Sequence, residues 1–180
     1  MKRCLHLMVI LIIFTSCDQV IFTEPQPRKV KELIEIPQIL HGTYLDQDGD
    51  TMYVDQGSFS YSSSEYGGLR NVFLSDSAVL KQYKDQYYYN ASVVVMEERF
   101  WLSYIIYLRD GGSGFDLYAM DPDDIVKLAK LQEISSKIRD IEDGEQKYYL
   151  FDPKKKDYKK IISDTIFTKM ISFRKIGFGK

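Results

Sequence analysis

Cysteine and histidine are scarce in this sequence, and their scarcity restricts the chemistry that the chain can perform. The cysteines are Cys4 and Cys17, and the histidines are His6 and His41. We expect Cys4 and His6 to be removed with an N-terminal signal, which leaves Cys17 and His41. Zinc sites built from Cys and His, Cys-His nucleophiles and the metalloprotease helix motif are therefore excluded. We predict no catalytic residue, no metal site and no cofactor.

Other enzyme classes receive little support from the motifs. A Ser-His-Asp triad would have to use His41, but the sequence contains no Gly-x-Ser-x-Gly turn, no Gly-x-Gly-x-x-Gly and no Walker loop. Glycosidase chemistry with two carboxylates stays open, because its signature is a separation in space. Trp101, Phe115 and Tyr118 could stack on a sugar, although aromatic residues in apolar runs are more often core residues.

The N-terminus has the order of a secretory signal. Lys2 and Arg3 precede an apolar run, Leu5 to Phe14, and the small pair Thr15-Ser16 precedes Cys17. The run is far shorter than the roughly 20 residues that cross a bilayer core of about 30 Å. We therefore predict cleavage between Ser16 and Cys17 rather than a spanning helix.

The residues Phe14-Thr15-Ser16-Cys17 resemble the lipobox of bacterial lipoproteins, with Phe14 in place of the usual Leu, as in Bacteroidetes-type lipoproteins. The resemblance implies that Cys17 carries diacylglycerol and a further acyl group such as palmitate. Two or more chains, at about 0.8 kcal/mol per buried CH₂, would hold a soluble domain at a membrane. The implied location is the cell envelope, at the outer membrane, facing the periplasm or the exterior. The alternative is an ordinary signal peptide followed by an unmodified Cys17.

Charge and length limit the partners of the mature chain. Removal of residues 1–16 takes away Lys2 and Arg3 but no acid, so the formal net charge changes from −2 to −4. A mildly acidic chain is a poor binder of phosphate backbones, so we exclude nucleic acid as a partner. The remaining length suits one domain. With Cys17 as the one cysteine left, no disulfide can form within the mature chain.

Two charged segments have a functional and a plain interpretation. Asp46 to Asp50 could offer oxygens to calcium, but the segment lacks the spacing of an EF-hand loop, which favours a solvated hairpin turn. Lys154-Lys155-Lys156 with Lys159 and Lys160 could bind an anionic lipid or polysaccharide. A basic run on a short helix is more often simply solvated.

Three short segments resemble the acceptor pattern of general O-glycosylation in Bacteroidetes, in which Asp precedes Ser or Thr and an aliphatic residue follows. They are Asp50-Thr51-Met52, Asp76-Ser77-Ala78 and Asp164-Thr165-Ile166. The resemblance implies modification at Thr51, Ser77 and Thr165, provided that their hydroxyl groups are exposed.

The organisation predicted for the chain is a signal peptide over 1–16, a lipidated N-terminus and extended tether over 17–38, and one domain over 39–180. Three of the five prolines lie in the tether segment. In the domain, strands are expected at 39–45 and 51–54 around an Asp-Gly turn, and at 86–96, 100–108, 115–120 and 147–151. The serine-rich stretch 58–68 is expected to be a mobile or weakly paired connection.

Two helices and a last strand complete the prediction. Asp121 and Pro122 have the types that begin a helix, and apolar residues recur from Ile125 to Ile141, which predicts one long amphipathic helix. A short basic helix, 154–163, and a strand, 165–174, follow. The expected class is α+β, with a mostly antiparallel β meander that forms a sandwich or a partly closed barrel.

The functional prediction combines the anchor with the missing catalytic motifs. Ile36-Pro37, Gly42-Thr43-Tyr44 and Thr51 to Val54 resemble the opening of small uncharacterised Bacteroidetes lipoproteins, in which a Gly-x-Tyr step begins a lipocalin-like meander. We expect a lipid-anchored, non-catalytic accessory or binding module that contacts an envelope protein or a glycan. The alternatives are a carbohydrate-active hydrolase with paired carboxylates and a lipocalin-like carrier of an apolar ligand.

Overall fold

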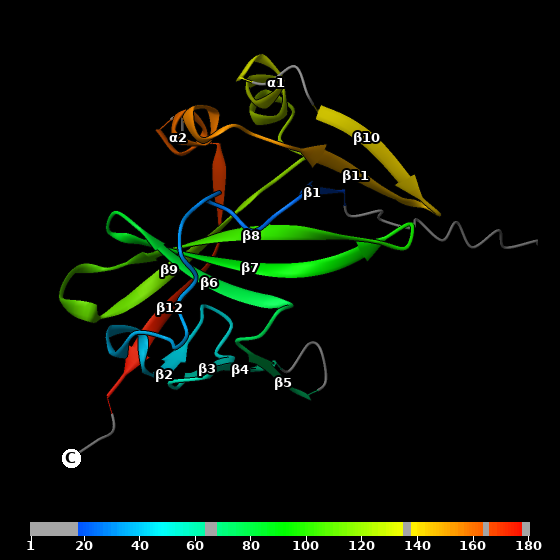
Figure 1. The fold of residues 1–180 in the computed structure, drawn as a ribbon. Helices are drawn as coiled ribbons and strands as arrows, with labels where there is room; N and C mark the ends of the chain where they lie inside the picture. Colours follow the sequence, from blue (N-terminus) through cyan, green and yellow to red (C-terminus); the bar gives the residue numbers. More distant parts are fainter. Residues whose placement is uncertain (1–17, 64–67, 135–137, 164–165, 178–180) are drawn as a thin grey trace, which may run out of the picture.

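The computed structural model describes residues 18–63, 68–134, 138–163 and 166–177, and most of these residues belong to one hydrogen-bonded sheet (Figure 1). The strands are β1 Gln19–Phe22, β2 Gly42–Leu45, β3 Thr51–Val54, β4 Ser58–Ser63, β5 Gly68–Phe73, β6 Ala78–Tyr83, β7 Gln86–Val95, β8 Glu98–Leu108, β9 Gly114–Met120, β10 Ile138–Asp143, β11 Gln146–Phe151 and β12 Phe167–Ile176. The α-helices are α1 Ile125–Ile134 and α2 Lys155–Ser163. Two 3₁₀ turns, Gln38–Leu40 and Asp110–Gly112, complete the elements. The predicted β-rich α+β class is confirmed.

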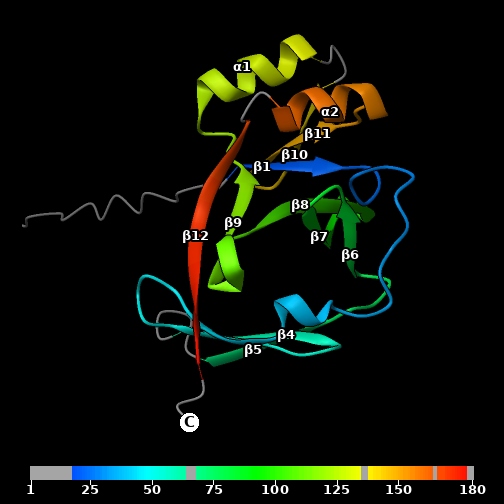
Figure 2. The ribbon, with the colours of Figure 1, turned by 90° about the vertical axis from the view of Figure 1, so that its left-hand side faces the viewer.

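The sheet is continuous but folds over on itself. Its main path is β10-β11-β1-β8-β9-β12-β2-β3-β4-β5, and β6 and β7 extend from the other edge of β8. All strand pairs are antiparallel except β1 with β11. Figures 1 and 2 show β2 to β5 as one layer facing β6 to β9, while β12 runs from the helices to β2. Within the described residues β5 and β6 do not pair, so the sheet is an open, curled one and not a closed barrel.

Most of the predicted strands lie where the alternating patterns placed them. The hairpin of β2 and β3 surrounds the Asp-Gly turn, and β7 and β8 form a long antiparallel pair. The predicted mobile or weakly paired connection over 58–68 is wrong for residues 58–63, which form β4 and pair with β5 over six positions, while residues 64–67 lie outside the described part of the chain. In β4 the serines alternate with Phe59 and Tyr61, whose partly buried rings pack against the core. This alternation is the pattern of a half-buried strand, but the high serine content led to the prediction of a connection instead.

The helix observed in the structure is shorter than the long helix that the apolar stripe predicted. Helix α1 ends at Ile134, and Ile138 and Ile141 lie in β10, which pairs with β11. The turn between β10 and β11 contains Gly144 at φ +64° after Asp143, an Asp-Gly hairpin signal that favours pairing of β10 with β11 over a longer helix. The N-cap is Asp124 and not Asp121, because Asp124 Oδ1 accepts the Lys127 N–H at 3.1 Å.

The predicted tether over 17–38 is also wrong, because the segment from Gln19 to Leu40 is part of the folded body. Strand β1 pairs with β11 along its whole length and contacts β8 through Phe22 and Trp101. Leu33 N–H donates to the Leu80 carbonyl at 2.8 Å, so this N-terminal segment covers the free edge of β6. Apolar residues of the segment, Val20, Ile21, Phe22, Ile36 and Leu40, are buried, and their burial outweighs the prolines and charges between them.

Buried polar side chains hold the same segment against the sheet. Asn90 on β7 accepts the Gln26 N–H and donates to the Gln26 carbonyl, each at 2.8 Å. Lys81 on β6 donates from Nζ to the carbonyls of Pro25 at 2.8 Å and Pro27 at 3.3 Å. Burial lowers the pKa of Lys81, against the opposing effect of nearby Glu32 and Glu24. These groups therefore serve to fix the backbone.

The core divides into clusters on the two faces of the curled sheet. The cluster under the helices joins Leu131 of α1 and Tyr158 and Ile161 of α2 to Phe22 and Phe151. A second cluster lies between the two layers of strands, and it includes Tyr44, Leu80, Tyr87, Ile106, Phe115 and Phe173. This inner cluster is incompletely filled, and the remaining space is the pocket described next.

Candidate functional site

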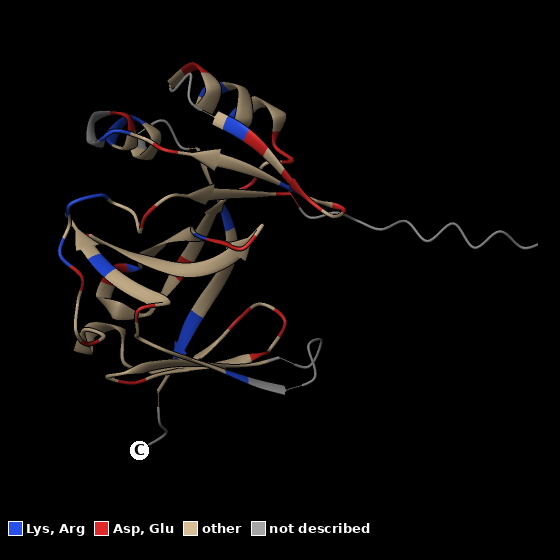
Figure 3. Ribbon diagram, turned by 45° about the vertical axis from the view of Figure 1, so that its right-hand side comes forward, with Lys and Arg blue, Asp and Glu red and all other residues tan. Residues whose placement is uncertain are grey.

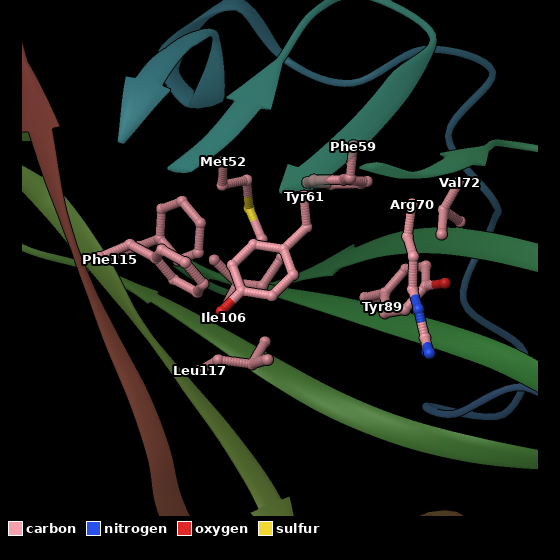
Figure 4. Close-up of a pocket in the computed structure, with 10 residues that line it drawn as sticks. Met52, Phe59, Tyr61, Arg70, Val72, Tyr89, Ile106, Phe115 and Leu117 are labelled. Atoms are coloured by element: carbon pink, nitrogen blue, oxygen red, sulfur yellow. The ribbon is translucent and has the colours of Figure 1, made fainter. Parts of the chain in front are cut away.

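An apolar pocket of about 230 Å³ lies between the two layers of strands (Figure 4). Its lining residues come from seven strands, β3, β4, β5, β7, β8, β9 and β12. They are Met52, Phe59, Tyr61, Arg70, Val72, Tyr89, Ile106, Phe115, Leu117 and Phe173. The curl of the sheet therefore brings together side chains that are up to 121 positions apart in sequence.

The β3–β5 wall of the pocket follows from strand register. Met52 on β3 lies opposite Tyr61 on β4, and Tyr61 lies opposite Arg70 on β5, so these three residues form one cross-strand row. Phe59 and Val72 form the next row. Successive residues of a strand point to opposite faces, so residues two apart share the inner face. Ser60 and Ser62 take the alternate positions on the outer face, while Ser58 at the start of β4 is buried.

The opposite wall is formed by the long strands and closed by aromatic contacts between the layers. The rings of Phe59 and Tyr89 lie 5.7 Å apart between centroids, and those of Tyr61 and Phe173 lie 6.1 Å apart in an edge-to-face contact. Phe115 packs on Phe173 at 5.0 Å. Burial, with a smaller contribution from Tyr104, raises the pKa of Tyr89 to about 12, so this phenol stays neutral at physiological pH.

The acidic turn between β2 and β3 reaches the rim of the pocket. Asp46 Oδ2 accepts the Tyr61 hydroxyl at 2.7 Å, and Asp46 Oδ1 accepts the backbone N–H groups of Asp48 and Asp50 at 2.9 Å. Among the described residues, no group of three or more His, Cys, Asp or Glu side chains is arranged to hold a metal ion. The hairpin-turn interpretation of this segment is the one that the contacts favour.

A second, smaller groove of about 140 Å³ carries carboxylates. Asp18, Asp121 and Asp123 line it together with Tyr104 and apolar residues. Asp121 Oδ1 accepts the Asp123 N–H at 3.0 Å, which uses one carboxylate oxygen in the turn before α1. This groove brings acids and an aromatic side chain together in a concave surface, which is one feature that the hydrolase alternative requires.

The aromatic residues considered for sugar stacking belong to the core. Trp101 and Phe115 are 8% and 1% exposed, so neither presents a ring face to solvent. Tyr118 is partly buried and packs edge-to-face on Tyr107 at 4.8 Å. His41 is likewise occupied, because its Nε2 lies 2.7 Å from the Ile36 carbonyl oxygen. The core interpretation is confirmed for Trp101 and Phe115.

The exposure of the described lysines in the basic segment 154–160 is compatible both with binding of an anionic lipid or polysaccharide and with simple solvation. Lys154, Lys159 and Lys160 are exposed at or before α2, while the side chains of Lys155 and Lys156 lie outside the described part of the chain. Figure 3 shows the acidic residues concentrated along β10 and its following turn, where Asp140, Glu142, Asp143 and Glu145 lie. None of the described helices has the length and apolar character needed to cross a bilayer.

The predicted modification sites are only partly visible in the structure. Ser16, Cys17 and Thr165 lie outside the described residues. Ser77 is exposed in the turn before β6, and its hydroxyl lies 3.0 Å from that of Ser75. Thr51 is half-buried at the start of β3. Exposure thus favours Ser77 over Thr51 as an acceptor.

Comparisons with known proteins leave the pocket as the main guide to function. No family model, no curated protein and no solved structure matches this chain. No motif in the sequence predicted the pocket. The signal that could have found part of it is the alternation of Phe59 and Tyr61 with serines, which marks an inward-facing aromatic row.

Proposed function

We propose that this chain is a lipid-anchored, non-catalytic binding protein of the cell envelope that takes a small apolar ligand into the pocket between its two strand layers. The observation that supports this proposal most directly is the pocket itself, an apolar space left inside an otherwise packed core. Protein interiors are normally packed to the density of organic crystals. An apolar space of this size therefore supports a role in binding a ligand.

The pocket volume sets the size of the ligand. A cavity of about 150 Å³ holds a benzene molecule. By proportion, the space of about 230 Å³ has room for roughly nine carbon atoms. It is smaller than the roughly 300–1,000 Å³ of sites for drug-sized molecules. The ligand is therefore a short chain or a single small ring system.

The lining offers binding but not catalysis. Of the ten described residues that line the pocket, none has a carboxylate, an imidazole or a thiol, and its ionisable groups are Arg70, Tyr61 and Tyr89. General acid-base chemistry needs a group that changes protonation near the operating pH, which the partly buried Tyr89 phenol with a pKa of about 12 does not do. The proposed role is therefore capture or presentation of a ligand at the membrane where Cys17 would be anchored, next to an envelope partner.

Filling the pocket should abolish binding. A Val72→Phe variant places a larger side chain on the inner face of β5, and we expect its affinity for 1-octanol to fall at least tenfold relative to the parent protein, since the ligand would lose its space. Isothermal titration calorimetry measures the affinity, and burial of the apolar ligand should give a negative heat-capacity change.

The matched control makes the same change outside the pocket. Val94→Phe alters a β7 side chain that is 67% exposed and does not line the pocket, so its octanol affinity should equal that of the parent. A parent protein that does not bind octanol, or equal binding by all three proteins, contradicts the proposal.

The hydrolase alternative rests on the groove with Asp18, Asp121 and Asp123. Under the binding proposal, the purified protein should release no reducing sugar from envelope polysaccharides. Turnover that is lost in Asp121→Asn or Asp123→Asn would instead assign the activity to the second groove and overturn the non-catalytic role.

We also propose that Ser77 carries an O-linked glycan. Its exposure and the preceding Asp76 support the proposal. Protein purified from its native membrane should then exceed the mass of polypeptide plus lipid, and Ser77→Ala should remove the excess. Ser75→Ala is the control, because the Ser75 hydroxyl lies only 3.0 Å from that of Ser77 but does not follow an aspartate. A mass equal to polypeptide plus lipid would exclude the modification.

A further inference from the structure

Helix α1 is apolar on two sides, one buried and one exposed. Leu128, Leu131 and Ile134 pack into the core beneath the helices. Ile125 and Val126, in the first turn, are instead 78% and 60% exposed. Single exposed apolar residues are common on soluble proteins, whereas a group of them marks an interaction surface. The surroundings of this turn therefore decide whether it is such a surface.

Met170 on β12 extends the exposed apolar group from the helix to the sheet. It is 54% exposed and lies at the register shift between β12 and β9, where a bulge can redirect a side chain. Lys127 Nζ donates to Thr168 Oγ1 at 2.6 Å, which holds the first turn of α1 against β12, two residues from Met170. We call Ile125, Val126 and Met170 the α1–β12 face.

The described chain begins next to this face. Asp18, the first described residue, lines the second groove together with Met170 and Asp123. Ile125 follows Asp123 by two positions. In Figure 2, β1 starts beside the upper part of β12 and below the start of α1. Successive Cα atoms are about 3.8 Å apart, so a lipid attached to Cys17 would enter a bilayer beside this groove.

We infer that the α1–β12 face is the surface with which the lipid-anchored protein contacts its bilayer, and that its apolar side chains insert among zwitterionic headgroups. This inference rests on the lipid anchor of the proposed function and adds the orientation of the domain on the membrane. Exposed aliphatic side chains can enter the headgroup boundary, and a covalent lipid beside them raises their effective concentration there. Three such side chains orient the domain, while the acyl chains hold it.

Charge selects the kind of bilayer. Asp18, Asp121 and Asp123 line the groove beside the face, and the exposed Lys169 next to Met170 is outnumbered by these acids. An anionic leaflet attracts basic segments and repels carboxylates, so a zwitterionic surface fits this face better. The exposed lysines at α2 are the competing contact, and they would favour an anionic surface instead.

Labels at single positions of the lipidated protein test the inference. Processing would remove Cys4 and acylate Cys17, so an introduced cysteine supplies the free thiol of the mature chain. Ile125→Cys and Met170→Cys place a nitrobenzoxadiazole label on the face, in protein reconstituted into vesicles of phosphatidylcholine and phosphatidylethanolamine. We expect lipids that carry a nitroxide near the headgroup to quench both labels by about twofold or more.

Val94→Cys is the matched control, because Val94 is apolar and 67% exposed but lies elsewhere on the sheet. Phe22 at the end of β1 is opposite Trp101 in an antiparallel pair, so β1 starts toward the carboxyl end of β8. Val94 is opposite Arg99, near the beginning of β8. The nitroxide lipids should therefore leave the Val94 label unquenched.

A Lys159→Cys label reports the competing contact through α2, where Lys159 is exposed. Under the inference, this label stays unquenched. Replacement of part of the phosphatidylcholine by phosphatidylglycerol should reduce quenching at Ile125 and Met170, because the acids beside the face are repelled. Asp123→Asn should recover part of that loss, since it removes one of these charges.

The outcomes separate the inference from the anchor on which it rests. Acylated protein that floats with the vesicles, but whose Ile125 and Met170 labels are quenched no more than the Val94 label, shows that the anchor stands and the inference is wrong. Quenching at Lys159 in place of Ile125 also overturns the inference. Protein that carries no acyl mass and does not float with the vesicles contradicts the anchor of the proposed function, and the inference falls with it.

Discussion

A Cys17→Ala variant, produced in the native host beside the parent protein, is expected to lose its acyl mass and its partition into detergent completely. The expectation follows from the lipobox-like order Phe14-Thr15-Ser16-Cys17, in which the thiol is the single attachment point for lipid. At about 0.8 kcal/mol per buried CH₂, a diacylglycerol and a further acyl chain hold a domain at a membrane far more firmly than any exposed side chain could. Intact-mass analysis and detergent phase separation measure the two effects.

The control for this experiment is Cys4→Ala. Cys4 lies in the segment that cleavage would remove, so its substitution should leave both the mass of the mature protein and its partition unchanged. If the parent protein instead is free of lipid and stays in the aqueous phase, the anchor proposal is wrong and the chain is a secreted protein. The pocket proposal would not be affected by that outcome, because the ten described residues that line the pocket lie between Met52 and Phe173.

The second large effect is expected at Asn90, which ties the N-terminal segment to the sheet. Asn90→Ala leaves the Gln26 N–H and the Gln26 carbonyl buried without their partner. Each unsatisfied buried group costs about 1–3 kcal/mol, so the free energy of unfolding should fall by about 2–4 kcal/mol. Urea unfolding of the full chain in the Cys17→Ala background, which removes the lipid, measures this change.

An exposed asparagine provides the comparison for Asn90. Asn71 on β5 lies opposite Ser60 on the outer face, so Asn71→Ala should change the free energy of unfolding by less than about 0.5 kcal/mol. Hydrogen exchange should also increase in Asn90→Ala around Gln26, where the segment is released, before it increases in β7 and β8. Equal stability of the Asn90 and Asn71 variants would show that the segment is held by apolar burial alone.

The sequence predicted those elements whose local pattern and tertiary environment agree. The long runs of β7 and β8 contain β-branched and aromatic residues over ten and eleven positions, so no other element fits them. The prediction failed where a local signal had two interpretations. Apolar residues at three-residue steps suggested that Ile138 and Ile141 continue a helix, but pairing with β11 places them in a strand. The prolines around Gln26 suggested a tether, but the buried side chains of Asn90 and Lys81 make it part of the body.

The pocket could not be predicted from the sequence, for a different reason. A site built from seven strands depends on how far the sheet curls, and strand patterns fix register and facing but not curvature. Single residues were nevertheless predicted correctly, since Phe115 was expected in the core and forms one wall. Arg70 carried no sequence signal at all, because an arginine on a short strand usually lies on the outer face. The register with Tyr61 and the place of Arg70 in the pocket lining show that it faces inward.

If Cys17 carries the proposed lipid anchor, the early start of β1 limits how far the protein could act from a membrane. Gln19, the first residue of the sheet, follows Cys17 by two positions, and two residues span at most about 7 Å. With Cys17 acylated, the folded body would lie directly on the lipid headgroups. It would then meet its ligand by lateral diffusion along a leaflet and not by diffusion through the volume between membranes. Exchange of a ligand would then take place with the bilayer itself or with neighbours in the same plane, and the surface density of those neighbours would set its rate.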